Sequence, residues 1–275
     1  MSGPMEMGAA DILAQELAAL AFCWRLERRD GVTIGLTSHD RELHVGGLLY
    51  RAAPGMLPSA VRRGSALEPE SMDVRGALSS DAIAADDLDA GRWDGAALTL
   101  SLTEWTDPGG LWLELARGEI GAVEREGEGF TAELVGPAAV LDRPVAPETS
   151  PDCRAMLGDT ACRVDLGAYR QVAAVDAVDG QVVTIASGGF AADAFAFGSL
   201  RWLGGGNCGI VQAVIASDAA TVTLSDPPAF AVAAGTLVLL VQGCDKRMET
   251  CSGRFGNAAN FRGEPYLPGN DLLTR

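Results

Sequence analysis

Apolar and polar residues alternate along most of the chain, in short runs that glycine, aspartate and proline interrupt. An alternation with a period of two is typical of β-strands that bury one face, and the interrupting residues are typical of turns. Residues 22–53 predict three successive strands in a meander, with a tight hairpin turn at Arg29-Asp30-Gly31. Residues 170–187 predict another hairpin, around Asp179-Gly180. The pattern therefore predicts a mainly β protein.

Two short segments have the spacing of helices instead. Three leucines fall on one side of a predicted helix over residues 11–20, which Asp11 caps at its amino end. This helix is expected to pack on the first sheet. A second short helix is expected near residues 81–88.

The chain is expected to contain two β-domains joined by a proline-rich segment. That segment, residues 137–151, contains four prolines, and we place the domain boundary near residue 145. Residues 1–145 are expected to hold the N-terminal helix and a tube-like β-barrel. Residues 146–275 are expected to hold a second barrel and a small irregular metal-binding subdomain; the barrel spans about 169–242, and the subdomain about 146–168 and 243–275.

Composition limits the function. The 275 residues include 37 acidic and 21 basic ones, for a formal net charge of −16. This balance argues against wrapping nucleic acid, which needs a basic face, but it suits a surface past which DNA slides. On charge alone, a solvated acidic bacterial protein is the simpler interpretation. No apolar run reaches the roughly 18 residues that suggest a membrane span, and the first residues lack a secretion signal, so we expect synthesis in a reducing bacterial cytoplasm.

Four cysteines form two pairs at the ends of the second predicted barrel. Cys153 and Cys162 are separated by eight residues, and Cys244 and Cys251 by six. A fold that joins the ends of this barrel gathers four thiols, which can bind zinc or an iron–sulfur cluster. Neither pair has the short spacing typical of structural zinc, so the pattern favours a [4Fe–4S] cluster. Four unrelated buried cysteines, or disulfides formed outside the cell, remain the alternative.

The surroundings of these cysteines support the metal interpretation. Arg154, Arg163, Lys246 and Arg247 can offset the negative charge of a thiolate-ligated cluster, and local N–H groups can bond its sulfurs.

The other candidate residues favour structural roles. Cys23 is expected to be a small buried residue in a strand, and Cys208 a turn cysteine outside the site. His39 and His44 lack a companion nucleophile motif, and a turn histidine bonded to backbone is favoured over catalysis by His39. Three neighbouring acids do not fit a calcium loop and are expected to end a solvated helix: Asp86, Asp87 and Asp89.

Three stretches of the sequence together resemble one family. They are CWRLERRDGVTIGLTSHDREL, CRAMLGDTAC and GCDKRMETC followed by NAANFRGEPYLPG. The family is that of baseplate hub proteins of gene transfer agents and related siphophages, which is similar in role to the iron–sulfur tail tip protein of lambda-type phages. The resemblance runs from about residue 20 to residue 271, and its C-terminal motif is the most specific part.

The resemblance implies a structural, non-enzymatic hub at the tail tip of a virion-like particle. The hub would be a homotrimeric ring that continues the tail tube, joins a distal tail protein ring to a large tip protein, and lets DNA pass through its lumen. An iron–sulfur cluster would be bound by Cys153, Cys162, Cys244 and Cys251. One departure is Glu264-Pro265, where an aromatic residue is expected before the proline; it should affect local packing and leave the ligands untouched.

Two other functions fit parts of the sequence. One is a cytoplasmic β-protein with structural zinc. The other is an enzyme at the tail tip, either an iron–sulfur redox protein or a cell-wall hydrolase, although no paired carboxylate or Cys/His signature accompanies it.

Overall fold

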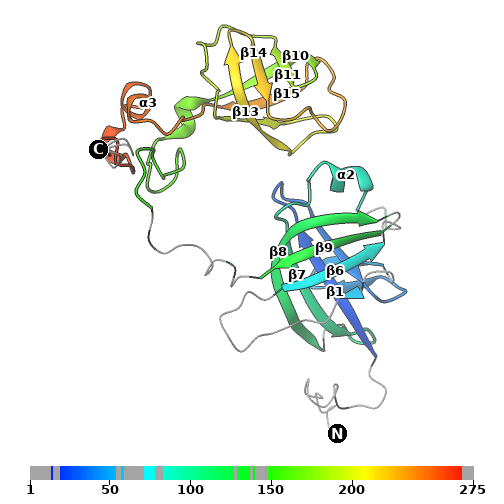
Figure 1. Ribbon diagram of the computed structural model, residues 1–275. Helices are drawn as coiled ribbons and strands as arrows, with labels where there is room; N and C mark the ends of the chain where they lie inside the picture. Colours follow the sequence, from blue (N-terminus) through cyan, green and yellow to red (C-terminus); the bar gives the residue numbers. More distant parts are fainter. Residues whose placement is uncertain are drawn as a thin grey trace. The chain divides into compact units, whose positions relative to one another are not determined.

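The computed structural model describes residues 14, 19–53, 57–58, 71–77, 83–108, 110–126, 129–136, 139, 146 and 148–267. The chain divides into two compact units, Met1–Val145 and Ala146–Arg275 (Figure 1). The helix expected over residues 11–20 and most of the proline-rich segment lie outside the described residues.

Nearly all regular structure is β, as the alternating pattern predicts. The elements of the first unit are β1 (Leu20–Glu27), β2 (Thr33–Thr37), β3 (Leu43–Val45), β4 (Leu48–Ala52), β5 (Leu57–Pro58), β6 (Ser71–Ala77), α2 (Ala85–Asp89), β7 (Ala97–Glu104), β8 (Trp112–Glu126) and β9 (Gly129–Val135). Those of the second unit are η2 (Leu166–Tyr169), β10 (Arg170–Asp179), β11 (Val182–Ile185), β12 (Ser199–Trp202), β13 (Val211–Asp218), β14 (Thr221–Leu224), β15 (Leu237–Val241), α3 (Met248–Gly253) and η3 (Ala258–Asn260).

The strands of the first unit form one nine-stranded sheet in the order β3-β4-β2-β1-β7-β8-β9-β6-β5. The predicted hairpin between β1 and β2 is confirmed, with Gly31 at φ +94° in its turn. The predicted meander is wrong, because β4 pairs parallel with β2 and β3 lies outside β4. Gly46 and Gly47, both at positive φ, make the tight β3–β4 turn. Gly35 lets β4 approach, since a Cβ there would lie 2.7 Å from the Leu49 carbonyl oxygen.

A closed barrel in the first unit is not seen within the described residues and stays a prediction. Within the described residues, the sheet begins at β3 and ends at β5, and these outermost strands do not pair with each other. β3 has three residues and β5 has two, so each offers few hydrogen bonds for closure. Pro58 in β5 has no N–H to donate to a further strand.

The core of the first unit lies on one face of the sheet, under the segment that carries α2. Trp24, Leu98 and Leu100 from the strands pack there with Leu88 and Trp93 from this segment. The interior strand β1 is buried on both faces, because its alternate residues join a smaller cluster on the other side. Its near-continuous apolar sequence, LAFCWRLE, follows from this position.

The second unit contains a closed six-stranded barrel in the order β10-β11-β14-β13-β12-β15, with β15 paired to β10. β10 pairs with β15 through its first half and with β11 through its second half. β13 changes partner in the same way, from β12 to β14. Each change falls at a bulge, where Asp176 or Ile215 is the extra residue. The two bulges bend the sheet enough for it to close.

The barrel interior is filled by apolar side chains. Leu200, Trp202 and Leu240 are fully buried there, and the indole N–H of Trp202 donates to Gln212 at 2.8 Å. The predicted hairpin at Asp179-Gly180 is confirmed. No helix within the described residues is long and apolar enough to cross a membrane.

Leu200→Ala should destabilise the barrel by about 2–5 kcal/mol, because it leaves a cavity in a closely packed interior. Amide hydrogen exchange of the barrel strands in the full chain measures this change. The exposed neighbour Arg201 provides the control, since Arg201→Ala should change the free energy of opening by less than about 0.5 kcal/mol. Equal exchange in the two variants would contradict the assignment of Leu200 to the core.

Candidate metal centre

Closure of the barrel brings the two cysteine-bearing segments together. The pairing of β10 with β15 places Arg170 opposite Val241, and the N–H of Gln242 donates to the carbonyl of Tyr169 at 2.8 Å. The chain therefore enters and leaves the barrel at one point, and the segments before β10 and after β15 lie side by side (Figure 1). Each segment contains two of the four cysteines.

Cys244 follows β15 directly, at a place where two backbones touch. A Cβ at Gly243 would lie 2.1 Å from the backbone of Phe197 and Gly198, so only glycine fits there. This contact fixes the start of the Cys244 loop against the barrel. Lys246, at φ +67°, then turns its N–H toward the sulfur of Cys244.

Cys153 is held by backbone hydrogen bonds to the C-terminal segment. Its N–H donates to the carbonyl of Lys246 at 2.8 Å, and the N–H of Arg154 donates to the carbonyl of Arg262 at 3.1 Å. The N–H of Arg262 in turn points at the Cys153 sulfur, 3.4 Å away.

Cys162 and Cys251 are linked through Asn257. The side-chain amide of Asn257 donates to the Cys162 carbonyl at 2.7 Å and lies 3.6 Å from its sulfur. The backbone N–H of Asn257 donates to the carbonyl of Cys251, at 2.9 Å. Cys251 lies in α3, and both Cys162 and Cys251 are buried.

The four thiols share one electrostatic environment. Burial raises the pKa of the Cys251 thiol, and the neighbouring thiols of the other three cysteines raise it further. Burial likewise raises the pKa of Cys244, where Asp245 and Cys153 add to the effect. The structure thus brings together all four residues that the sequence analysis selects.

The spacing of the four sulfurs bears on the kind of metal centre that they could hold. Zinc binds thiolate at about 2.3 Å, so the sulfurs of a tetrahedral site lie about 3.8 Å apart. Among the described residues, no group of three or more His, Cys, Asp or Glu side chains is placed to hold one ion. The sulfurs are close enough to perturb one another, and they receive N–H groups of the kind that bond cluster sulfurs. Thiols and directed N–H groups of this kind can serve a thiolate-bound metal centre, whether a single ion or a cluster.

Asp159 fixes the turn that presents Cys162. Its carboxylate accepts hydrogen bonds from the backbone N–H groups of Met156, Ala161 and Cys162, at 2.8, 2.9 and 2.6 Å. These hydrogen bonds hold the pKa of Asp159 below its usual value, and the bond from the Cys162 N–H has the largest effect. Arg163, which follows Cys162, has φ +63°, a conformation that costs a non-glycine residue free energy.

Glu264 joins the C-terminal tail to the Cys153 loop. Its two carboxylate oxygens accept from the guanidinium of Arg154 at 2.7 and 2.8 Å, and one also accepts the N–H of Ser150 at 2.9 Å. These contacts, chiefly the one to Arg154, lower the pKa of Glu264 to about 2. Glu264 therefore forms an ion pair with the residue that follows Cys153.

The sequence analysis missed two residues that shape the site, Asp159 and Asn257, and it named Glu264 without its partner Arg154. Only Asp159 has a local signal, because an Asp two or three residues before the N–H groups that it caps is a common turn pattern. Asn257 and Glu264 contact residues 95 and 110 positions away, which sequence spacing does not reveal. Two of the four predicted cations interact electrostatically with the thiols. Cys153 raises the pKa of Arg154, and Lys246 lowers the pKa of Cys244 against the effect of burial.

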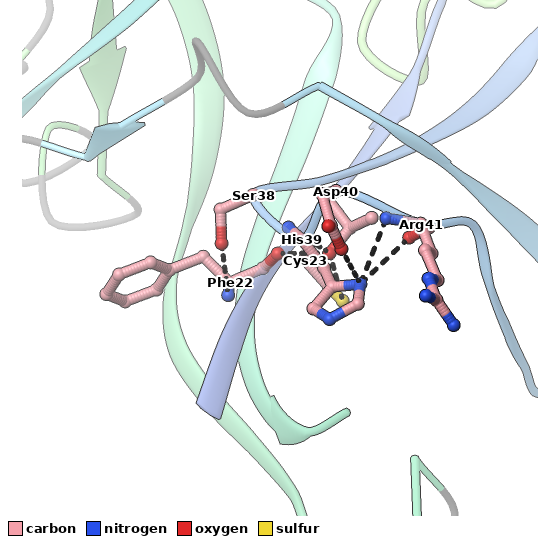
Figure 2. A network of polar contacts seen from close by, with 7 residues as sticks. Phe22, Cys23, Ser38, His39, Asp40 and Arg41 are labelled. Atoms are coloured by element: carbon pink, nitrogen blue, oxygen red, sulfur yellow. Dashed lines mark hydrogen bonds and ion pairs between the residues drawn. The ribbon is translucent and has the colours of Figure 1, made fainter. Parts of the chain in front are cut away.

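His39 is a turn histidine, as predicted. The N–H of Arg41 donates to its Nδ1 at 3.0 Å, and a carboxylate oxygen of Asp40 lies 3.2 Å from the same nitrogen (Figure 2). The imidazole also stacks on Trp105, with ring centroids 4.7 Å apart. These residues line a shallow depression of about 640 Å³.

The remaining candidates have structural surroundings. Cys23 is fully buried, as predicted, and its thiol donates to Thr37 at 3.8 Å. Cys208 is exposed in the turn between β12 and β13. Asp87 forms ion pairs with Arg28 and Arg92, so this acid is engaged inside the first unit and is not available as a cation ligand.

Comparison with known proteins places the chain in a family. Residues 7–165 match the family model for the N-terminal attachment domain of a baseplate hub protein, and residues 193–271 match that for phage conserved hypothetical protein BR0599. A chain from the structure described as "Virion of native gene transfer agent (GTA) particle" is 37% identical, with a TM-score of 0.85. The similarity covers 97% of this chain and 94% of that one. No curated protein matches the sequence.

The chain therefore belongs to the baseplate hub family, whose place is the tip of a phage-like tail. The two matched segments each contain one of the cysteine pairs.

Glu264→Gln should loosen the Cys153 loop in a pH-dependent manner. The folded-state pKa of about 2 lies below the usual 4.5, so the ion pair stabilises the fold above about pH 4.5, and this contribution disappears as the pH falls toward 2. Amide exchange of residues 148–155, measured from pH 6 to pH 2, should therefore converge for wild type and variant at low pH. Glu148→Gln, in the same segment, is the control and should behave like wild type. A pH-independent difference would argue against the ion pair as the cause.

Proposed function

We propose that this chain is a structural hub that forms a trimeric ring at the baseplate, with an iron–sulfur cluster bound by its four gathered cysteines. The observation that supports this most strongly is the meeting of Cys153, Cys162, Cys244 and Cys251 at the point where the barrel closes. Family membership supplies the place in the particle, and the donor chemistry of the sulfurs supplies the cofactor class.

The cluster, when bound, would act as a clip between two segments that are distant in the sequence. Residues 150–163 and 244–264 are already joined by hydrogen bonds from Cys153, Arg154 and Asn257. A cofactor that binds only the folded state adds its binding free energy to stability. The role of the chain's own residues would be to orient four sulfurs and direct N–H groups toward them, without a chemical step.

The ring would connect a distal tail protein ring to a large tip protein, and DNA would pass through its lumen. An excess of acidic over basic residues suits this role, because a negative surface does not retain DNA phosphates. The particle would be a gene transfer agent or a siphophage, in line with the structure that this chain resembles. We also propose that the hub is not an enzyme, and peptidoglycan release by the purified chain would contradict this.

Protein purified without oxygen should be brown, with absorbance at roughly 400 nm from iron–sulfur charge transfer, and should contain iron and inorganic sulfide. Zinc with no iron would support the structural-zinc alternative instead. Cys251→Ser should abolish the absorbance and lower the melting temperature. For a ligand at about 1,000 times its Kd the loss is roughly 4 kcal/mol, or about 10 °C for a protein of this size.

Cys208→Ser provides the matched control for Cys251→Ser. Cys208 is an exposed cysteine outside the site, so its replacement should leave absorbance and melting temperature unchanged. If Cys251→Ser and Cys208→Ser behave alike, the four-cysteine site is not the cofactor site.

Cells that produce the particle but lack this chain should accumulate tails without a complete tip, visible by electron microscopy. Wild type supplied in trans should restore the tip, and pull-down from these particles should recover the distal tail protein and the tip protein. Normal particles in the absence of the chain would contradict the hub role.

A further inference from the structure

One side of the barrel is apolar where it should face water. On the outer surface of β10, β15, β12 and β13, the register places Val172, Leu239, Arg201 and Val211 in one row. Val172 and Val211 are 57% and 58% exposed, and Leu237 nearby on β15 is 49% exposed. Outward positions of a solvated strand are normally polar, so this row points to a covered surface.

The opposite side of the barrel is more polar. There the outward positions of β11 and β14 are Val182, which is 39% exposed, and Thr184, Thr221 and Thr223. The fold thus does not require apolar residues on its outer surface, and their gathering on one side needs another explanation.

The bulges give a second contrast between the two sides. Asp176 and Ile215 occupy equivalent bulge positions in β10 and β13, and both point outward. The bulge in β10 has the solvated acid, whereas Ile215 is 55% exposed. Because bulges redirect side chains, the β13 bulge serves to present an apolar residue outside the barrel.

Phe197 extends this surface toward the cysteine loops. Its side chain is 69% exposed, and its backbone has φ +61°, a costly conformation for a bulky residue. The N–H of Phe197 donates to the carbonyl of Val214 at 2.9 Å, which fixes the phenyl ring beside Ile215. Strain of this kind is retained where it serves a function.

Two depressions flank this pair of side chains. They measure about 350 and 420 Å³, and both are lined by Phe197 and Ile215. The larger one continues to Cys244 and Lys246. We call the surface formed by Val172, Phe197, Val211, Ile215 and Leu237 the apolar face.

The charges of the apolar face indicate what covers it. Arg170 and Arg201 are the basic residues of the barrel strands, and both lie exposed among the apolar side chains. Neither forms an ion pair with another described residue. Elsewhere the chain is strongly acidic: residues 1–145 alone contain 24 acidic and 12 basic residues. A second copy therefore offers the carboxylates that these two arginines lack.

The same charges decide the symmetry of the contact. Two apolar faces related by a twofold axis would offer these arginines only Asp193 and Asp245, the carboxylates that line the depressions beside Phe197 and Ile215. A head-to-tail contact instead places the arginines of one copy against the acidic surface of the next, and such contacts close into rings. Apolar side chains interspersed with arginine are also the composition found at the centres of stable interfaces.

We propose that the apolar face is the surface by which one copy of this chain docks head-to-tail on a second copy. This inference deepens the proposed function, and it rests on that proposal for the existence of a ring of copies. The occupant is the acidic surface of the neighbouring copy, with Phe197 and Ile215 as the central apolar contacts and Arg201 as the charged one.

Phe197→Gly tests this with opposite effects on folding and assembly. Glycine adopts φ +61° without strain, so the variant should melt at the same temperature as wild type or higher. Removal of the phenyl group should nevertheless weaken self-association of the full chain at least tenfold, measured by sedimentation equilibrium. Unchanged association would overturn the inference.

A charge pair on each side of the barrel gives a matched comparison. Val172→Glu with Val211→Glu alters the apolar face, and Thr184→Glu with Thr223→Glu adds the same charge on the opposite side. We expect at least a hundredfold weaker association for the first variant and less than a threefold change for the second, with barrel amide exchange retained in both. Equal effects would overturn the inference.

The role of Arg201 is tested by salt. Wild-type association should weaken as sodium chloride rises, whereas Arg201→Glu should associate at least tenfold more weakly and lose this dependence. Wild type that stays monomeric at every concentration, yet is incorporated into particles, would overturn the inference and leave the hub role intact. Absence of the chain from particles would instead contradict the hub role itself.

Discussion

The pairing of β10 with β15 is the contact on which the rest of the second unit depends. It closes the barrel, and it also places the residue before the barrel opposite the residue after it. Two flanking segments that have little regular structure of their own are thereby brought within hydrogen-bond distance. Without this closure, the four cysteines would have no reason to meet, because eighty-one residues separate Cys162 from Cys244.

The cysteine lobe is organised by backbone contacts as well as by its sulfurs. Cys153 bonds to Lys246 through main-chain atoms, and Asn257 bonds to the main chain of both Cys162 and Cys251. The lobe is therefore shaped before any cofactor is considered, which reduces the entropy that a bound cluster would have to overcome. The left-handed conformations at Arg163 and Lys246 lie beside the cysteines: the N–H of Lys246 is directed at the Cys244 sulfur, and that of Arg163 donates to the carbonyl of Asp159 at 2.8 Å.

The two sides of the barrel divide the roles of the second unit. Its interior and the β10–β15 seam support the cysteine lobe, while its outer surface differs between the threonine side and the apolar face. Phe197 and Gly198 join these roles physically, because the same short segment supports the backbone of Gly243 and displays the exposed phenyl ring. The backbone of this segment thus supports the cysteine loop, while the side chain of Phe197 belongs to the surface.

Local chemistry made part of this protein predictable from its sequence. The hairpins at Asp30-Gly31 and Asp179-Gly180 and the mainly β character follow from turn residues and alternation. The two cysteine pairs were visible as a candidate site for the same reason. Long-range pairings were not predictable: the parallel β2–β4 contact, the strand order of the first unit's sheet, and the contacts of Asn257 and Glu264 depend on residues far apart in the chain. The sequence by itself determined which short elements form, and only the tertiary structure decided which of them meet, because those meetings depend on packing and closure of the whole fold.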